Sequence, residues 1–166
     1  MAFFDIANFE VSAEVAKLLG FKRILKTSDV CSGGNALIVR GVKELSLSAV
    51  RRHASPTSLG IESALASHSR IEESALHYLA ERGKLLVINA GSLTFANTEL
   101  LPVLVRRGRW LYAHSAHVGL PIAIATFAES KSALLSSAQL LRIATLFGAD
   151  FSTAKQMLSM LGSVVA

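Results

Sequence analysis

The sequence predicts an α/β domain built as a contracted or incomplete TIM-barrel-like (β/α) barrel, with about seven strands and surrounding helices. Three observations lead to this fold class. Short β-type apolar runs alternate with helix-period segments, as in largely parallel sheets. The apolar residues are mostly Leu, Ala, Val and Ile, which suits strands buried on both faces. The chain has 166 residues, one domain spanning 1–166, whereas a full barrel usually needs roughly 200 or more.

The predicted strands come from short apolar or alternating runs. Two connections between them, 29–35 and 115–120, are shorter than the roughly dozen residues of a parallel crossover. Either those two strand pairs are antiparallel, or one member of each pair is not a strand. The predicted strands are 3–7, 22–28, 36–40, 59–65, 84–89, 110–113 and 121–128.

The predicted helices come from apolar residues at helical spacing followed by a stop signal. Ser69 and Glu72 form a capping-box pattern before the third helix. Thr98 can cap the fourth, whose first turn tolerates Pro102. The helices are expected to end at Gly20, His53, Gly83, Gly108 and Gly148, and a last helix follows Gly148.

Composition limits the class of protein. The single cysteine, Cys31, excludes an intrachain disulfide and a CxxC zinc site. The start of the sequence, MAFFDIANFE, carries acidic residues and no basic signal-type region, and no apolar run reaches the roughly 18 residues of a membrane span. We therefore expect a cytoplasmic chain without a membrane partner.

Basic residues are the most suggestive polar feature. The formal net charge of +5 is compatible with a nucleic-acid partner or with ordinary solubility charge. Arginine pairs phosphate oxygens bidentately, so arginine clusters at predicted helix ends are candidate RNA contacts. The alternative is that cations at helix carboxyl ends only complement the helix dipole. The candidate RNA-binding residues are Arg40, Lys43, Arg51, Arg52, Arg106, Arg107 and Arg109.

Several segments match one known family. The matching segments are Phe4-Asp5-Ile6, Leu86–Ala90, 97–108 (NTELLPVLVRRG), Trp110-Leu111-Tyr112, Ile122–Ala128, Leu146-Phe147-Gly148, and Ala154-Lys155 with Ser159. On these residues the chain resembles the ribonuclease P protein component 3 family, as a short divergent member. The resemblance is poor between Asp29 and Ser69. It also fails at Leu135–Gln139, which reads LSSAQ where the family usually has an Arg, a Pro and an Asp.

The resemblance implies a role beside a catalytic RNA. It implies a protein subunit of ribonuclease P, which removes 5′ leaders from precursor tRNA. The expected partners are ribonuclease P RNA, precursor tRNA and another ribonuclease P protein subunit. The protein would support RNA folding and binding, so no catalytic residue, metal site or protein-bound cofactor is assigned. Mg²⁺ is expected on the RNA of the holoenzyme.

Two alternatives remain open at this stage. Metal-dependent phosphoesterases of the same barrel type begin with an Asp-x-His-x-His strand, but Ala7 and Phe9 occupy the two histidine positions after Asp5. A metal-dependent hydrolase would have to use His114 and His117, which are expected at a strand end, with acidic residues such as Asp5 and Glu62. A non-enzymatic scaffold that binds another protein is the second alternative.

Overall fold

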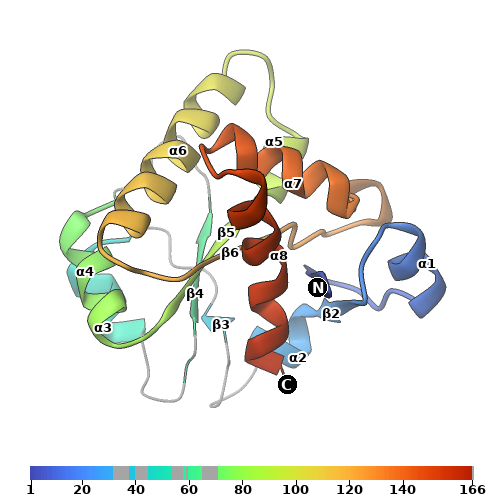
Figure 1. Ribbon diagram of the computed structural model, residues 1–166, viewed down its shortest axis with the longest axis horizontal. Helices are drawn as coiled ribbons and strands as arrows, with labels where there is room; N and C mark the ends of the chain where they lie inside the picture. Colours follow the sequence, from blue (N-terminus) through green and yellow to red (C-terminus); the bar gives the residue numbers. More distant parts are fainter. Residues whose placement is uncertain (32–37, 40–44, 54–57, 59, 65–70, 166) are drawn as a thin grey trace.

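The computed structural model describes residues 1–31, 38–39, 45–53, 58, 60–64 and 71–165. Their strands form two parallel sheets (Figure 1). The first sheet pairs β1 (Phe4–Ala7) with β2 (Arg23–Lys26). The second has the order β3 (Ile38–Val39), β4 (Gly60–Ala64), β5 (Leu85–Asn89) and β6 (Ile122–Ala125).

The prediction of a barrel with about seven strands is wrong. In the part of the chain that the structure describes there are six strands, and they lie in two separate sheets without closing. The sheets meet at one parallel bridge between Ala7 and Ala128, where Asn8 N donates to the Ala128 carbonyl at 2.8 Å. One predicted strand, 110–113, lies inside a helix.

In the described part of the chain, helices and one 3₁₀ turn cover the sheets (Figure 1). The helices are α1 (Ala13–Leu18), α2 (Thr27–Cys31), α3 (Leu47–His53), α4 (Glu73–Glu81), α5 (Gly91–Thr94), α6 (Leu101–His117), α7 (Ser137–Leu146) and α8 (Phe151–Val165), and the 3₁₀ turn is Lys131–Ala133. The described helices include none with the length and apolarity that a membrane span requires.

Helix α6 continues through the glycine that was expected to end it. Its buried positions, Leu104, Gly108, Leu111 and Ser115, are spaced four, three and four residues apart, which is a helical face. Gly108 is buried against the Phe147 ring, and a Cβ there would overlap that ring. The glycine therefore permits a close helix contact, and the short 115–120 connection is simply the link from α6 to β6.

The other short connection and one cap also differ from expectation. Helix α2 fills the start of the 29–35 connection, and β2 pairs with β1. Glu72 is the N-cap of α4, with no side-chain cap bond, and its carboxylate accepts a hydrogen bond from Leu47 N at 2.9 Å. The predicted capping box is therefore wrong at Glu72, and Ser69 lies outside the described residues. Ser136 and Gln139 form a capping box at the start of α7.

Alternating strand residues contribute to two apolar clusters. Leu86, Ile88 and Ile124 pack in a cluster that includes buried residues of α4, α6 and α7. The intervening residues Val87 and Ala123 pack in a second cluster that also contains Leu161 of α8. Side chains on both faces of these strands are buried in the core. The residues at the strand ends are therefore the ones that can contact a ligand.

Candidate functional site

Arg106, Arg109 and Arg142 form a cationic surface that we call the α6–α7 arginine group. Neither helix contains Asp or Glu along its length. The Nε atom of Arg109 donates a hydrogen bond to the Leu146 carbonyl at 2.7 Å, which joins the middle of α6 to the end of α7. Arg142 lies four residues before Leu146, on the same side of α7. All three arginines are exposed.

The bond to Leu146 fixes the direction of the Arg109 side chain. Within the described residues, its terminal guanidinium nitrogens have no partner, and neither do the guanidinium groups of Arg106 and Arg142. Holding a guanidinium in place removes part of the entropy cost of binding an anion. The geometry therefore suits phosphate binding by the remaining N–H groups of Arg109.

The dipole of α6 does not explain Arg106, Arg107 and Arg109, although the bond from Arg109 to the Leu146 carbonyl does complement the carboxyl end of α7. Arg106, Arg107 and Arg109 lie in the middle of the 17-residue helix α6, and not at a helix end as expected. The dipole acts within about the last turn, where α6 has His114 and His117. Arg107 is half-buried. Of the other candidates, Arg51 and Arg52 lie on α3, and Arg40 and Lys43 fall outside the described residues.

A second cluster, the α3–α4 arginine group, consists of Arg51, Arg52 and Arg82. The guanidinium carbons of Arg51 and Arg82 lie 5.5 and 5.2 Å from the centroid of the Tyr78 ring. Arg52 Nε donates to the carbonyl of Ser48 at 3.4 Å. Helix α4 itself begins and ends with glutamates. Arg51 and Arg82 are therefore held against an aromatic ring, and α4 adds carboxylates to this group.

A cleft of about 220 Å³ lies at the carboxyl ends of β5 and β6. Asn89, at the end of β5, forms part of its wall. The Asn89 side chain donates to Glu62 at 2.6 Å and accepts from Gly91 N at 2.9 Å, so its amide has a fixed orientation. The cleft is lined by Asn89, Gly91, Ser92, Phe95, Thr126, Phe127, Ala128, Glu129 and Ala133.

A buried carboxylate supports the same end of the sheet. Asp5 is fully buried and accepts hydrogen bonds from Thr126 N at 2.7 Å and Thr126 Oγ1 at 2.6 Å. Burial raises the pKa of Asp5 from 3.8 to about 6, and the Thr126 bonds lower it. The next residue, Phe127, has a φ of 47°, a conformation uncommon for a bulky side chain. Asp5 therefore holds β1 against the segment that borders the cleft.

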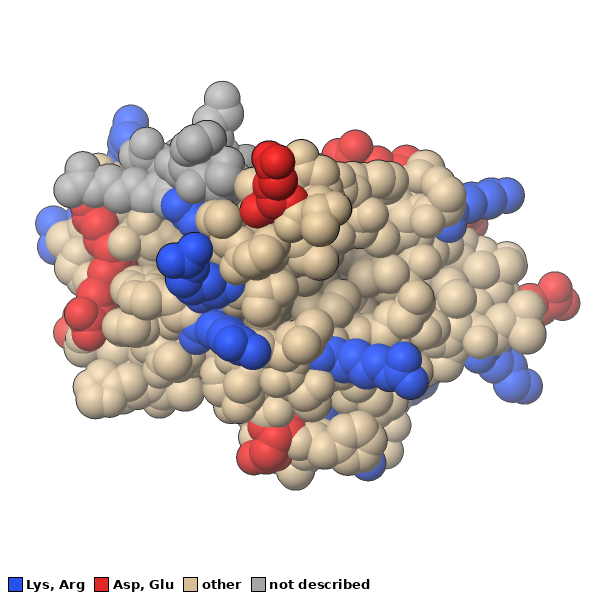
Figure 2. Space-filling view, turned by 90° about the horizontal axis from the view of Figure 1, so that it is seen from above, with Lys and Arg blue, Asp and Glu red and all other residues tan. Residues whose placement is uncertain are grey.

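Figure 2 looks from above onto the side of the molecule where α5 follows β5 in Figure 1. Lys and Arg side chains follow one another across the middle of this face, and Asp and Glu lie mostly toward its edges. A concentration of positive charge on one face favours a polyanionic partner.

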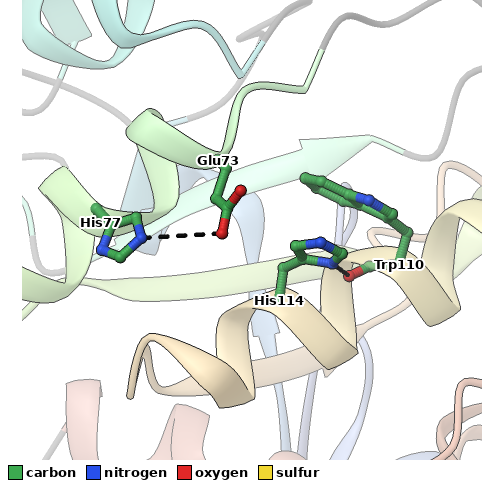
Figure 3. Close-up of polar contacts among 4 residues, drawn as sticks. All are labelled: Glu73, His77, Trp110 and His114. Atoms are coloured by element: carbon green, nitrogen blue, oxygen red, sulfur yellow. Dashed lines mark hydrogen bonds and ion pairs between the residues drawn. The ribbon is translucent and has the colours of Figure 1, made fainter.

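The histidine pair does not assemble a metal site. His114 and His117 are in the last turn of α6, and not at a strand end as expected. The His114 ring stacks on Trp110, with centroids 3.9 Å apart, and its Nδ1 lies 2.9 Å from the Trp110 carbonyl (Figure 3). Glu73 is directed at His77, 3.9 Å away (Figure 3). Among the described residues no three His, Cys, Asp or Glu side chains are placed to hold an ion.

Comparison with known proteins gives only distant structural likeness. No family model matches the chain, and no curated protein matches it. Two solved structures of one protein are similar at 16% identity: one, described as an uncharacterized protein, has a TM-score of 0.44, and the other, described as a prolidase complexed with N-methylphosphonate-L-proline, has a TM-score of 0.41. They cover 70% and 69% of this chain, and the match spans 32% of each of theirs. At these TM-scores neither match indicates a function.

Sequence reasoning missed Arg142 and the cleft. Arg142 follows two leucines within a helical pattern, and only its spacing to Leu146 marks it as a neighbour of the helix end. Phe95, Asn97 and the residues between them suggest a turn after a strand. Nothing in the sequence says that this turn lies beside the segment after β6.

Proposed function

We propose that this chain is a protein subunit of ribonuclease P, the RNA-based endonuclease that removes 5′ leaders from precursor tRNA. In this role it acts in the cytoplasm, binds RNA backbone and supports RNA folding, while the RNA carries out the cleavage. The observation that carries the proposal is the α6–α7 arginine group, in which Arg109 is fixed by the Leu146 carbonyl and no carboxylate lies on either helix.

The segments that resemble the family supply part of this group. Segment 97–108 contributes Arg106, and segment 146–148 contributes the Leu146 carbonyl and the Phe147 ring that packs on Gly108. Arg109 and Arg142 lie outside the resembling segments, so the resemblance accounts for one of the three arginines and for the contact that positions Arg109. One further segment, Trp110-Leu111-Tyr112, was matched to a family strand and is helical here.

The chemistry of such a surface is charge neutralisation. Each phosphate contact by arginine releases condensed counterions from the RNA, so binding weakens steeply as salt rises. Reduced repulsion between RNA segments lets the RNA reach its active fold with less Mg²⁺, and that Mg²⁺ is bound by RNA. Backbone contacts of this kind position RNA without reading its sequence. A second protein subunit of the holoenzyme completes the proposed set of partners.

No observation favours the metal-dependent hydrolase. His114 and His117 lie at the end of α6 that leads into the start of β6, whereas Asp5 binds Thr126 just beyond the end of β6. The intervening strand spans roughly 13 Å at about 3.3 Å per residue. These side chains are therefore at opposite ends of β6, too far apart to share one ion.

Reconstitution with ribonuclease P RNA and precursor tRNA tests the proposal. Adding the wild-type chain should increase the cleavage rate at low Mg²⁺ and reduce the Mg²⁺ concentration needed for half-maximal rate. A variant with Arg106→Gln, Arg109→Gln and Arg142→Gln should lose most of this effect. A matched variant with Lys17→Gln, Lys22→Gln and Arg23→Gln, which removes the same charge from exposed positions elsewhere, should keep it.

The readouts separate a wrong proposal from a damaged protein. Circular dichroism and thermal unfolding should show that both variants are folded. If the wild-type chain changes neither the cleavage rate nor the Mg²⁺ requirement, the chain is not a ribonuclease P subunit. If both triple variants lose the effect equally, the α6–α7 arginine group is not the contact surface.

A further inference from the structure

The cleft at the carboxyl ends of β5 and β6 has the size and walls that one nucleobase requires. Its volume of about 220 Å³ is smaller than the roughly 300 Å³ or more of sites for drug-sized ligands. Phe95 lines it and is 74% exposed, so one ring face is open to a ligand. Unpaired RNA bases are recognised by stacking on such rings and by hydrogen bonds along their edges.

The backbone opposite Phe95 is held in an unusual conformation. Phe127 is 2% exposed and has a φ of 47°. Gly91 lies so close to the Thr126 carbonyl that a Cβ would overlap it. Uncommon backbone conformations cluster at ligand-binding sites, where the surrounding structure maintains them. Here the Asp5–Thr126 hydrogen bonds do so, at 2.6 and 2.7 Å.

The polar groups of the cleft are mainly acceptors. Glu129 has an exposed carboxylate, and neither it nor the Ser92 hydroxyl has a side-chain partner in the part of the chain that the structure describes. Carboxylates accept hydrogen bonds from the exocyclic amino groups of bases, as glutamate does from cytosine N4. Uracil has no amino group. Thr126 is already bonded to Asp5, so it is not the group that reads the base.

We infer that this cleft binds one unpaired RNA base that carries an exocyclic amino group, with Phe95 stacking on the ring and Glu129 accepting from the amino group. Phosphates on either side of the base then meet basic side chains beside the cleft. Lys131, exposed and two residues after Glu129, is the basic residue nearest to Glu129 in the sequence. RNA as the partner rests on the proposed function; the base preference is an addition to it.

Binding of the full chain to fluorescein-labelled RNA homopolymers of about twelve nucleotides tests this inference. Oligo(A) and oligo(C) should bind more tightly than oligo(U). Phe95→Ala should weaken oligo(A) and oligo(C) binding about tenfold, as loss of base stacking does, and should remove the preference. Phe95→Trp should retain it. Glu129→Gln should reduce the preference, because a glutamine amide can also donate to uracil O4.

A matched control separates stacking from general surface effects. Phe151→Ala removes an aromatic ring that is 59% exposed on α8, and it should leave binding and preference unchanged. Equal binding of all three homopolymers, or equal loss in the Phe95→Ala and Phe151→Ala variants, would overturn the inference. The proposed function survives that outcome if the chain still lowers the Mg²⁺ requirement of ribonuclease P RNA. Conversely, a Phe95-dependent preference without that effect supports the cleft and contradicts the proposed function.

Discussion

The two arginine groups differ in what surrounds each guanidinium. In the α3–α4 arginine group, Arg51 and Arg82 both contact the Tyr78 ring, and α4 carries Glu73 and Glu81. In the α6–α7 arginine group, neither helix carries a carboxylate, and Arg109 is bonded through Nε alone. Both groups contain neighbouring basic residues, so spacing in the sequence does not separate them. Their surroundings separate them, because Arg51 and Arg82 lie against an aromatic ring beside a helix that carries glutamates, whereas α6 and α7 carry no carboxylate that would repel phosphate.

Charge reversal should give the largest difference between the groups. Changing Arg106, Arg109 and Arg142 to Glu should weaken binding to ribonuclease P RNA about 300-fold at low salt, since repulsion replaces phosphate contacts. Changing Arg51, Arg52 and Arg82 to Glu should weaken it only a few-fold. Filter binding or fluorescence anisotropy measures both. If the two variants lose RNA affinity to a similar extent, the two arginine groups do not differ in RNA binding.

The comparison requires equally folded variants, and the ionisation of Asp5 makes the stability of the fold depend on pH. Its folded-state pKa of about 6 lies above its ordinary value of 3.8, so its contribution to stability is fully present below about pH 4 and is lost as pH rises through 6. Asp5→Asn keeps an acceptor for Thr126 N and removes the ionisation. Relative to the wild type, this variant should gain about 2 kcal/mol in unfolding free energy between pH 4 and pH 7.

Urea unfolding at several pH values measures this effect, and Asp150→Asn is the control. Hydrogen bonds from Thr153 hold the pKa of Asp150 below its ordinary value, so its contribution to stability is lost as pH falls. The two aspartate variants should therefore show pH trends of opposite sign. A difference between wild type and Asp5→Asn that is independent of pH would mean that burial does not perturb Asp5.

Gly108→Ala should disturb the packing of α6 on α7, which positions the α6–α7 arginine group. An added Cβ meets the Phe147 ring, so the variant should lose about 2 kcal/mol of unfolding free energy and displace α7 from α6. RNA binding should weaken with it, because the Arg109–Leu146 bond spans that contact. Ser74→Ala, at an exposed position of α4, should change neither property. Unchanged RNA affinity in a measurably destabilised Gly108→Ala variant would show that the α6–α7 contact does not position the arginines.

Arg109→Lys should give the smallest effect. Lysine keeps the charge but lacks both the Nε–H that binds the Leu146 carbonyl and the planar fork that suits phosphate. RNA affinity should fall about threefold. The corresponding change on α3, Arg51→Lys, should have no measurable effect on RNA affinity. If Arg109→Lys binds as tightly as the wild type, charge alone explains the surface.

The sequence predicts most individual strands and helices, but it does not predict whether the strands close into a barrel. Strands 3–7 and 84–89 and the helix ending at Gly20 are confirmed, because their local patterns are unambiguous. Segment 110–113 was assigned to a strand because Gly108 was interpreted as a helix stop. A glycine that ends a helix and a glycine that admits a neighbouring ring look the same in one sequence. Interpreting Gly108 as a helix stop adds a seventh strand, and a larger number of strands favours a barrel.

The site was less predictable than the fold. Arg106, Arg107 and Arg109 are predicted from their clustering at an expected helix end, but their place in the middle of α6 and the link to Leu146 depend on how two distant helices pack. Arg51 and Arg52 were given the same weight because the contacts of Tyr78 are not visible in the sequence. The cleft joins residues after β5 to residues after β6, and strand pairing alone brings them together.

The salt dependence of RNA binding tests the central claim most directly. The slope of log affinity against log salt reports how many phosphate contacts the protein makes. Replacing Arg106, Arg109 and Arg142 with Gln should reduce the magnitude of the slope by about 2, at roughly 0.7 per contact, whereas replacing Arg51, Arg52 and Arg82 should change it by less than about 0.7. Equal slopes for the wild type and the first variant would contradict the claim that the α6–α7 arginine group contacts RNA phosphates.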